Sequence, residues 1–317
     1  MKKVLIFIII FVLFMLTSCT TIDNSKIDTS ETSNSGESSN VPQEPGESSD
    51  KSEVQVVEAD ATKNTQNLIN TSGSTVQERI RVPEGFERVE TEPGSYGQYL
   101  RDLPVRQDGA PIKLYNGDVT GKDVHAAVLD IDVGTRDLQQ CADAIIRLRA
   151  EYLYGLGMYE KIHFNFTNGF NADYTSWMNG KRIVIDGNKS YWVKKTEYSR
   201  EYNSFRKYLD LVFAYAGTLS LSKEMVQVDI ADMQIGDVFI KGATPGHAVL
   251  IMDMAQNKET GEKLFLTAQS YMPAQDIHIL KNNNNLELSP WYPVKFGEIL
   301  STPEWEFDKG QLMRFKD

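Results

Sequence analysis

Aromatic residues are distributed very unevenly along this chain. Residues 20–85 contain no Phe, Tyr or Trp, and every aromatic residue beyond the amino-terminal apolar segment lies between Phe86 and Phe315. A segment without large apolar side chains buries too little surface to offset the conformational entropy lost on folding. We therefore expect a disordered, acidic tether over residues 19–85 and one main globular domain over residues 86–317.

The first 18 residues are typical of a secretory signal. Lys2 and Lys3 precede an unbroken apolar run from Val4 to Leu16. A helix of this length covers about 20 Å, less than the roughly 30 Å hydrocarbon core of a bilayer. The segment is therefore predicted to be a cleaved signal peptide over residues 1–18 rather than a permanent span.

Residues 16–19, Leu-Thr-Ser-Cys, resemble the lipobox of bacterial lipoproteins. The resemblance implies that Cys19 is the lipidation site and the first residue of the mature protein. The alternative is that Cys19 is an ordinary residue of a membrane anchor. In both cases the globular part lies outside the cytoplasmic membrane. We expect it to be lipid-anchored there, or to the outer membrane in a two-membrane cell.

The chain is acidic, with 33 basic and 44 acidic residues and a net charge of −11. Residues 20–60 hold ten acids against Lys26 and Lys51, so most of the acidity belongs to the tether. Acidic residues of this kind keep the tether solvated and are not evidence for a particular ligand. No basic stripe opposes the overall field, which argues against nucleic acid as a partner. Glycine-rich phosphate loops are missing from the sequence, and we expect no cofactor.

The hydrophobic pattern predicts an α+β fold. Helical spacing precedes a series of segments with a period of two, which is typical of helices followed by an antiparallel meander. The expected elements are a strand at 125–132, helices at 136–154 and 206–219, and antiparallel strands at 237–240, 247–253 and 264–271. The predicted core is 125–155 and 230–285, with an insertion at about 156–225.

Cys141 is a candidate nucleophile. It lies near the start of the first predicted helix, where the helix dipole favours a thiolate. A structural role is the alternative, because Cys141 falls on a stripe with Leu138, Ile145 and Leu148 at the spacing of a buried helix face. If Cys19 carries lipid, Cys141 has no disulfide partner within the chain.

His247 is a candidate base, because it opens a strand directly after a Thr-Pro-Gly turn. An imidazole so placed can deprotonate a thiol and later protonate a leaving amine. A hairpin turn near Glu259 places Gln269 diagonal to His247 on the same face, where its amide can orient the ring. A register shift by one residue would place Ser270 or Ala268 there instead.

Two resemblances follow from these motifs. Residues 236–239 (Gly-Asp-Val-Phe), 245–251 (Pro-Gly-His-Ala-Val-Leu-Ile) and 268–270 (Ala-Gln-Ser) resemble the histidine half of NlpC-type and CHAP-type cysteine peptidases and amidases. The resemblance implies a papain-like core with a helix-borne Cys, in which Cys141, His247 and Gln269 are nucleophile, base and polar third residue. The chain departs from it in three ways: His247 follows Cys141 by 106 positions, the third residue is Gln, and the Asp-Cys-Ser helix start of NlpC-type enzymes is missing.

The chain from Phe86 onward also resembles the uncharacterised bacterial lipoprotein family called domain of unknown function 4846. Three segments carry this second resemblance: residues 138–144 (Leu-Gln-Gln-Cys-Ala-Asp-Ala), 163–170 (His-Phe-Asn-Phe-Thr-Asn-Gly-Phe) and 268–275 (Ala-Gln-Ser-Tyr-Met-Pro-Ala-Gln). Because that family is uncharacterised, the second resemblance implies no activity.

Two functional hypotheses remain open. The first is an extracytoplasmic cysteine peptidase or amidase acting on peptidoglycan-type peptide or amide bonds. The second is a non-catalytic envelope lipoprotein that binds glycan or protein through the same fold. Aromatic and polar residues at 165–177, 291–292 and 303–305 are typical of a glycan groove, or of loops that pack on the core. His125, His163 and His278 lack the spacing of metal ligands, so no metal site is expected.

Overall fold

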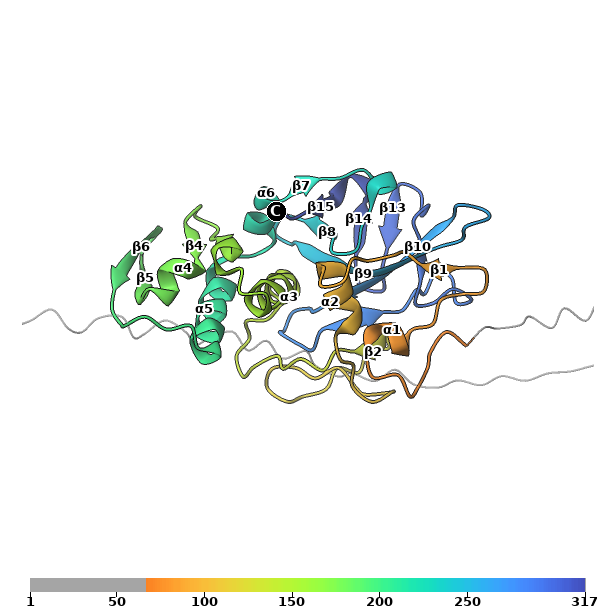
Figure 1. The fold of residues 1–317 in the computed structure, drawn as a ribbon, viewed down its shortest axis with the longest axis horizontal. Helices are drawn as coiled ribbons and strands as arrows, with labels where there is room; N and C mark the ends of the chain where they lie inside the picture. Colours follow the sequence, from red (N-terminus) through yellow and green to blue (C-terminus); the bar gives the residue numbers. More distant parts are fainter. Residues whose placement is uncertain (1–66, 317) are drawn as a thin grey trace, which may run out of the picture. The chain divides into compact units, whose positions relative to one another are not determined.

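A nine-stranded antiparallel sheet organises the part of the chain that the computed structural model describes, residues 67–316 (Figure 1). Its strands follow the order β2-β11-β10-β9-β8-β15-β7, with β1 beside β9 and β12 beside β10. The strands are β1 (Glu87–Arg88), β2 (His125–Val128), β7 (Val226–Gln227), β8 (Val238–Lys241), β9 (His247–Gln256), β10 (Lys263–Gln269), β11 (His278–Leu280), β12 (Tyr292–Pro293) and β15 (Leu312–Arg314).

Helices and three two-stranded sheets surround this large sheet. The helices are α1 (Val76–Arg79), α2 (Tyr96–Asp102), α3 (Cys141–Gly155), α4 (Tyr174–Met178), α5 (Tyr202–Tyr215) and α6 (Thr218–Glu224), with single 3₁₀ turns at Tyr159–Lys161, Ile230–Asp232 and Lys309–Gln311. The small sheets pair β3 (His163–Asn165) with β4 (Asn171–Asp173), β5 (Lys181–Asp186) with β6 (Lys189–Lys194), and β13 (Ile299–Ser301) with β14 (Glu306–Asp308). The expected α+β class with antiparallel sheets and one main domain is confirmed.

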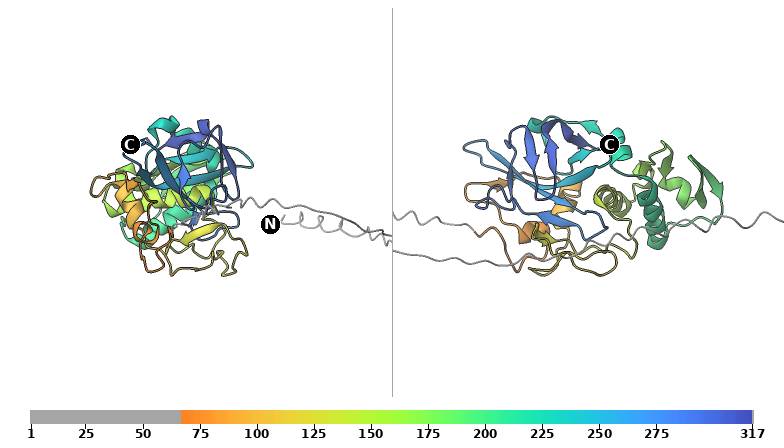
Figure 2. Two further views of the ribbon diagram at one scale, coloured as in Figure 1. Left: turned by 90° about the vertical axis from the view of Figure 1, so that its right-hand side faces the viewer. Right: turned by 180° about the vertical axis from the view of Figure 1, so that it is seen from behind.

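Strand β9 shows how the sheet divides the core. Ala248 and Leu250 belong to the larger hydrophobic cluster, which also contains Ile145 of α3. Val249 belongs to a second cluster, which contains Phe307 of β14. Because neighbouring side chains of a strand point to opposite faces, the mostly apolar β9 is buried on both sides. Figure 2 shows helices on one side of the large sheet and β13–β14 on the other.

The expected hairpin strands are found where the sequence placed them, in β8, β9 and β10. The first helix begins later than expected, at Cys141 rather than 136, because the backbone N–H of Gln140 is held by Asp143 Oδ2 at 3.1 Å instead of continuing a helix. The second expected helix, 206–219, is in fact two helices. α5 ends at Tyr215, and α6 begins at Thr218 after extended residues at Ala216 and Gly217.

The expected boundary between tether and domain, at residues 85 and 86, lies too late in the chain. Leu68, Val76 and Ile80 are buried in the core, and Ile69 forms a β-bridge with Ile80. This segment contributes aliphatic rather than aromatic side chains, so the aromatic boundary could not detect it. Residues 1–66, with the expected signal peptide, Cys19 and most of the expected tether, lie outside the described residues. Among the described helices, none has the length and apolar character needed to cross a membrane.

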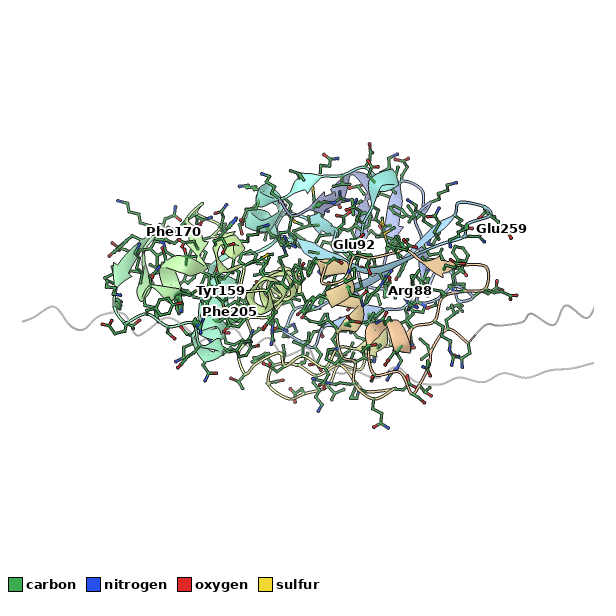
Figure 3. All side chains as sticks on the ribbon, in the orientation of Figure 1. Arg88, Glu92, Tyr159, Phe170, Phe205 and Glu259 are labelled. Atoms are coloured by element: carbon green, nitrogen blue, oxygen red, sulfur yellow. The ribbon has the colours of Figure 1, made fainter. Side chains whose placement is uncertain are left out.

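Residues 156–225 pack beside α3 at one end of the large sheet (Figure 1). Their core is aromatic: Phe205 of α5 stacks on Tyr154 with ring centroids 4.3 Å apart and meets Tyr174 edge-on at 5.2 Å. Figure 3 labels Tyr159, Phe170 and Phe205 in this part of the molecule. The region supplies the end of α5 and the start of α6 to the cleft described next.

Candidate functional site

A cleft of about 490 Å³ lies where the start of α3, the end of α5 and the loop before β9 meet. Its walls are mostly apolar, and the side chains that line it include no Lys or Arg. The lining residues are Asp137, Leu138, Gln140, Cys141, Ala142, Asp143, Phe213, Ala214, Ala216, Gly217, Thr218, Ala243, Thr244, Pro245, Gly246, His247, Tyr271, Met272 and Trp305.

Cys141 is the first residue of α3 and is a free thiol. Its sulfur interacts with the backbone N–H groups of Ala142, Ala248 and Cys141 itself. Ala248 directly follows His247, so the thiol lies against the strand that carries the histidine. Burial raises the pKa of Cys141 to about 11, with a further increase from the carboxyl group of Asp143 and a partial decrease from these N–H groups.

Gly246 allows the chain to reach His247 through a confined space. A Cβ atom at this position would lie 2.3 Å from Thr218 Oγ1 of α6 and 2.5 Å from the carbonyl oxygen of Ala243. Only glycine fits so close an approach without movement of backbone. The tight turn therefore fixes the start of β9 against α6 and with it the position of the histidine.

The side chains of His247 and Gln269 are in direct contact, with 2.7 Å between His247 Nε2 and Gln269 Oε1. The register predicted from the sequence produces this contact. Strands β9 and β10 pair Ala268 with Leu250, which leaves Gln269 diagonal to His247. A β-bulge between Leu266 and Thr267 shifts the pairing by one residue along the hairpin. The register at the histidine end is the expected one.

Gln269 is itself held from two sides. Its Nε2 donates to Glu304 Oε2 at 2.6 Å and lies 3.3 Å from Nε2 of His278. Nδ1 of His278 lies 2.9 Å from the backbone carbonyl oxygen of Asp276. Glu304 also forms an ion pair with Lys122. Four elements, β9, β10, β11 and the β13–β14 connection, thus contribute to one buried hydrogen-bond chain.

This chain determines which nitrogen of His247 carries the proton. A carbonyl oxygen only accepts, so His278 is protonated on Nδ1 and its Nε2 accepts from Gln269. A carboxylate also only accepts, so both amide hydrogens of Gln269 are directed to Glu304 and His278. The amide oxygen then accepts from Nε2–H of His247, which leaves Nδ1 as the basic nitrogen. Nδ1 makes no hydrogen bond with residues 67–316, and His247, which lines the cleft, is 2% exposed.

Three aromatic rings also lie close to the imidazole of His247. Its ring centroid lies 4.8 Å from that of Tyr271, 5.2 Å from Trp305 and 6.0 Å from Phe307. Burial lowers the pKa of His247 to about 4, although the hydrogen bond that its Nε2–H donates to Gln269 and the charge of Glu304 act in the opposite direction. The imidazole is therefore neutral at pH 7.

Asp143 lies two residues after the thiol and also lines the cleft. Its Oδ1 is buried without a hydrogen-bond partner among the described residues, and burial raises its pKa well above the usual range. Where this carboxyl group ionises, its negative charge opposes a thiolate beside it, so Cys141 stays a neutral thiol.

The structure thus brings two of the three predicted site residues into contact and places the third in the same cleft. No hydrogen bond joins the thiol of Cys141 to His247 within residues 67–316; the thiol bonds the adjacent backbone instead. Ser270, the alternative to Gln269, is used elsewhere: its Oγ lies 2.9 Å from the carbonyl oxygen of Gln139 and 2.8 Å from that of Gln275.

Glu304, His278 and Asp143 are the polar groups that sequence reasoning did not assign to this site. His278 was considered only as a metal ligand. Glu304 lies in the Pro-Glu-Trp segment, whose Trp305 was noted as a glycan-stacking residue. The pairing of β10 with β11 places Gln269 opposite His278. The same hairpin reasoning that paired β9 with β10, applied to the next strand, could have predicted this neighbour. Nothing in the local sequence connects Glu304, 35 residues further on, with Gln269.

The segments expected to form a glycan groove are not brought together. Trp305 lines the cleft, whereas Trp291 is fully buried in the core and Trp177 is covered by the guanidinium of Arg182 at 4.0 Å. Across residues 67–316, no group of three or more His, Cys, Asp and Glu side chains could hold a metal ion.

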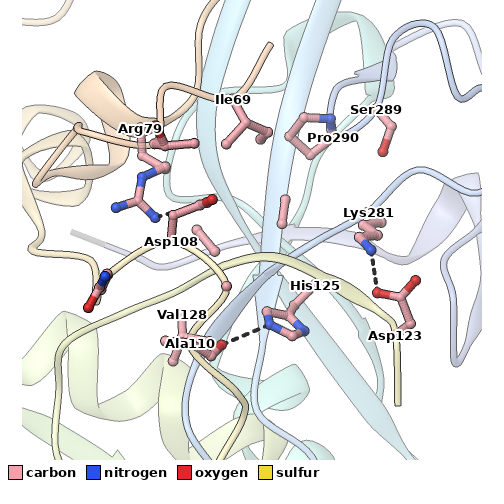
Figure 4. A pocket seen from close by; sticks show the side chains of 15 residues that line it. Ile69, Arg79, Asp108, Ala110, Asp123, His125, Val128, Lys281, Ser289 and Pro290 are labelled. Carbon is pink, nitrogen blue, oxygen red and sulfur yellow. Dashed lines mark hydrogen bonds and ion pairs between the residues drawn. The ribbon is translucent and has the colours of Figure 1, made fainter. Parts of the chain in front are cut away.

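A second cavity, of about 470 Å³, lies along β2 (Figure 4). Its charged groups are already paired. Lys281 contacts Asp123, Arg79 Nη1 is 3.6 Å from Asp108, and Nε2 of His125 is 3.0 Å from the carbonyl oxygen of Ala110. Because no cysteine is among its lining residues, this cavity offers no thiol nucleophile, and the first cleft remains the candidate site.

Comparison with known proteins assigns the chain to a family. Residues 76–314 match the family model described as Domain of unknown function (4846), which covers more than half of the chain. No curated protein and no solved structure gave a significant match. The match begins at the first residue of α1 and ends in β15, so it includes the cleft and the whole hydrogen-bond chain behind His247. The protein belongs to the family described as Domain of unknown function (4846).

Proposed function

We propose that this protein is a cysteine hydrolase of papain-like design that cleaves peptide or amide bonds in the bacterial envelope. One observation supports the proposal most: the chain of hydrogen bonds from Glu304 and His278 through Gln269 leaves Nδ1 of His247 unprotonated. A residue needed only for packing gains nothing from such control of its tautomer. In this design Cys141 is the nucleophile, His247 the base and Gln269 the orienting residue.

The chemistry begins with a neutral thiol and a neutral imidazole, because burial raises the pKa of Cys141 to about 11 and lowers that of His247 to about 4. When the substrate carbonyl is in place, the sulfur forms a bond to the carbonyl carbon and the thiol proton passes to Nδ1 of His247. The carbonyl electron pair moves onto oxygen, near the amino-terminal N–H groups of α3, which favour negative charge.

Collapse of this tetrahedral intermediate breaks the carbon–nitrogen bond. The imidazolium returns its proton to the leaving amine, which leaves a thioester on Cys141. Water then attacks the thioester carbon, His247 accepts one proton from that water, and the sulfur leaves with the proton as a thiol. Gln269 donates nothing to the substrate; it holds the ring so that Nδ1 serves in both steps.

The walls of the cleft and the expected location of the protein support a proposal for the substrate class. Phe213, Tyr271 and Trp305 offer apolar and aromatic surface, and the acidic side chains that line the cleft are Asp137 and Asp143. Such walls suit a neutral or amine-bearing peptide attached to sugar better than an anionic ligand. Together with the lipoprotein signal expected at residues 1–19, this points to peptidoglycan-type peptides outside the cytoplasmic membrane.

The test uses the chain from residue 19 to 317 with Cys19→Ser, which retains every described residue and leaves Cys141 as the only thiol. Purified peptidoglycan peptides are incubated with this protein and with its Cys141→Ala form, and new amino groups are counted. We expect release of amines by the parent protein and none by Cys141→Ala. Cleavage by both forms would reject a thiol nucleophile, and cleavage by neither would reject this substrate class.

A second function, non-catalytic binding of a glycan or peptide in the same cleft, is favoured by the high thiol pKa of Cys141 and by the lack of a hydrogen bond from its thiol to His247. Thiol labelling separates the two functions. A hydrolase should react with an iodoacetamide probe at Cys141 in the native state. A binding protein should react only after denaturation, and its ligand affinity should survive Cys141→Ala.

A further inference from the structure

The β5–β6 hairpin and the residues that follow it form a local basic segment, an exception to the expectation that no basic stripe opposes the acidic field of the chain. Residues 181–200 contain six Lys and Arg residues against two acids, a net charge of +4 in a chain of net −11. Lys189 and Lys195 are exposed and form no ion pair with the described residues. Elsewhere, Lys258 and Lys309 are paired with Glu87 and Glu298. Positive charge is therefore both concentrated and available on the hairpin.

Both faces of the hairpin carry apolar side chains, which is unusual for a two-stranded ribbon that packs on one side only. Ile183 and Trp192, which pair across the ribbon, face the core; Trp192 lies 5.7 Å from Phe170 between ring centroids. The alternate residues therefore form the opposite face. On it, Val184 pairs with Tyr191 and Arg182 with Val193. Tyr191 and Val193 are 47% and 36% exposed, although a solvent-facing side of a sheet is normally polar.

We infer that this outer face of the hairpin, Val184, Tyr191 and Val193 with the flanking Lys189 and Lys195, docks on an anionic lipid bilayer. A tyrosine inserts its ring among headgroups while its hydroxyl stays hydrated, and lysines extend their ammonium groups to lipid phosphates. The basic residues supply attraction that acts over a Debye length, and the apolar stripe supplies contact.

The sequence places a bilayer within reach. Cys19, the expected lipid attachment site, precedes Asn67, the first described residue, by 48 positions, which span at most about 160 Å when fully extended. A domain tied to a bilayer experiences it at a high effective concentration, so weak contacts suffice to hold one face against it. The inference does not depend on the proposed hydrolase, because no residue of the cleft takes part.

The test is vesicle sedimentation with the unlipidated chain from residue 19 to 317 carrying Cys19→Ser. Vesicles contain either phosphatidylcholine alone or phosphatidylcholine with about 30% phosphatidylglycerol. The anionic lipid gives the second kind a negative surface potential, which attracts basic segments. We expect binding to the anionic vesicles, little binding to the neutral ones, and a decrease in binding as salt rises. Lys189→Glu with Lys195→Glu should weaken binding about tenfold or more, and Tyr191→Ser with Val193→Thr by several-fold.

The matched control is Lys258→Glu with Lys309→Glu, which changes the net charge equally at exposed lysines elsewhere. An equal loss in this control would show a general charge effect and overturn the proposal, as would equal binding to both kinds of vesicle. Long-chain polyphosphate serves as a soluble competitor. If it binds as tightly as the vesicles and the Tyr191→Ser, Val193→Thr protein binds normally, the partner is a polyanion and not a bilayer.

Discussion

His247 and Cys141 line the same cleft, but the structure fixes them by different means. The imidazole is held by directional bonds: Gln269 contacts Nε2, and Glu304 and His278 determine the direction of that amide. The thiol is held by packing and by backbone N–H groups, and no side chain of residues 67–316 forms a hydrogen bond with it. The hydrogen-bond chain sets the tautomer of His247, and one substitution can break it. The buried helix start sets the position of the Cys141 thiol, and a single substitution there should have a smaller effect. The following predictions separate these two kinds of control.

The largest effect is expected from His247→Ala. If Nδ1 is the base, its removal should lower kcat/KM on an envelope peptide by about 10³-fold or more, because proton transfer from the thiol and to the leaving amine are both lost. Steady-state kinetics provide the measurement. The matched control is His163→Ala, an exposed histidine on β3 that does not line the cleft. Equal losses in both variants would show that the effect is not specific to this base.

Glu304→Gln should have the next largest effect. A glutamine can present either its oxygen or its nitrogen, so it no longer forces the amide of Gln269 into one orientation, and part of the population carries the proton on the wrong nitrogen of His247. We expect kcat to fall about 10- to 100-fold with KM nearly unchanged, which identifies a positioning role. Glu298→Gln, at an exposed ion pair with Lys309, is the control. A rise in KM alone would contradict the tautomer argument.

A third prediction concerns pH and stability. Burial lowers the pKa values of His247 and His278 to about 4, while an unfolded histidine titrates near 6.5. Between these values the unfolded chain binds more protons, so the free energy of unfolding should decrease as the pH falls from 6.5 to 4. The decrease should be about 2 kcal/mol or more per histidine.

Urea denaturation at pH 7, 5.5 and 4.5 measures this slope. His278→Gln removes one of the two titrating rings, so its slope should be smaller even if the variant is less stable at every pH. A slope identical to that of the parent protein would mean that His278 is not held neutral by burial.

The smallest effect is expected on the cysteine side. Asp143 raises the pKa of the Cys141 thiol, so Asp143→Asn should lower that pKa and increase the thiolate fraction at any pH below it. Alkylation of native protein by iodoacetamide at pH 8 should become about threefold faster. Asp186→Asn, at the turn of the β5–β6 hairpin, should leave the rate unchanged. A slower rate in Asp143→Asn would indicate that the carboxyl group instead holds the helix start in place.

The sequence predicted the histidine side of the cleft better than its surroundings. Alternating apolar residues identified β9 and β10, and a single turn position set the register that brings Gln269 to His247. Glu304 escaped prediction because a contact between a strand and a connection 35 residues away depends on the packing of β13–β14 against the sheet. Local patterns do not encode that packing. Leu68 and Val76 were not predicted to belong to the core for a different reason. Isolated aliphatic residues in a polar segment hardly change its composition, although both side chains are buried.

The close contact at Gly246 has a consequence for how chains of this family can diverge. Because the turn before His247 rests on Thr218, residues 156–217 can lengthen or shorten without moving the histidine, provided that the chain returns to the same point at the start of α6. A side chain at position 246 would press on Thr218, so any shift at the start of α6 would also move the imidazole of His247. We therefore expect the number of residues before Thr218 to vary among chains of this family. Position 246 should remain glycine.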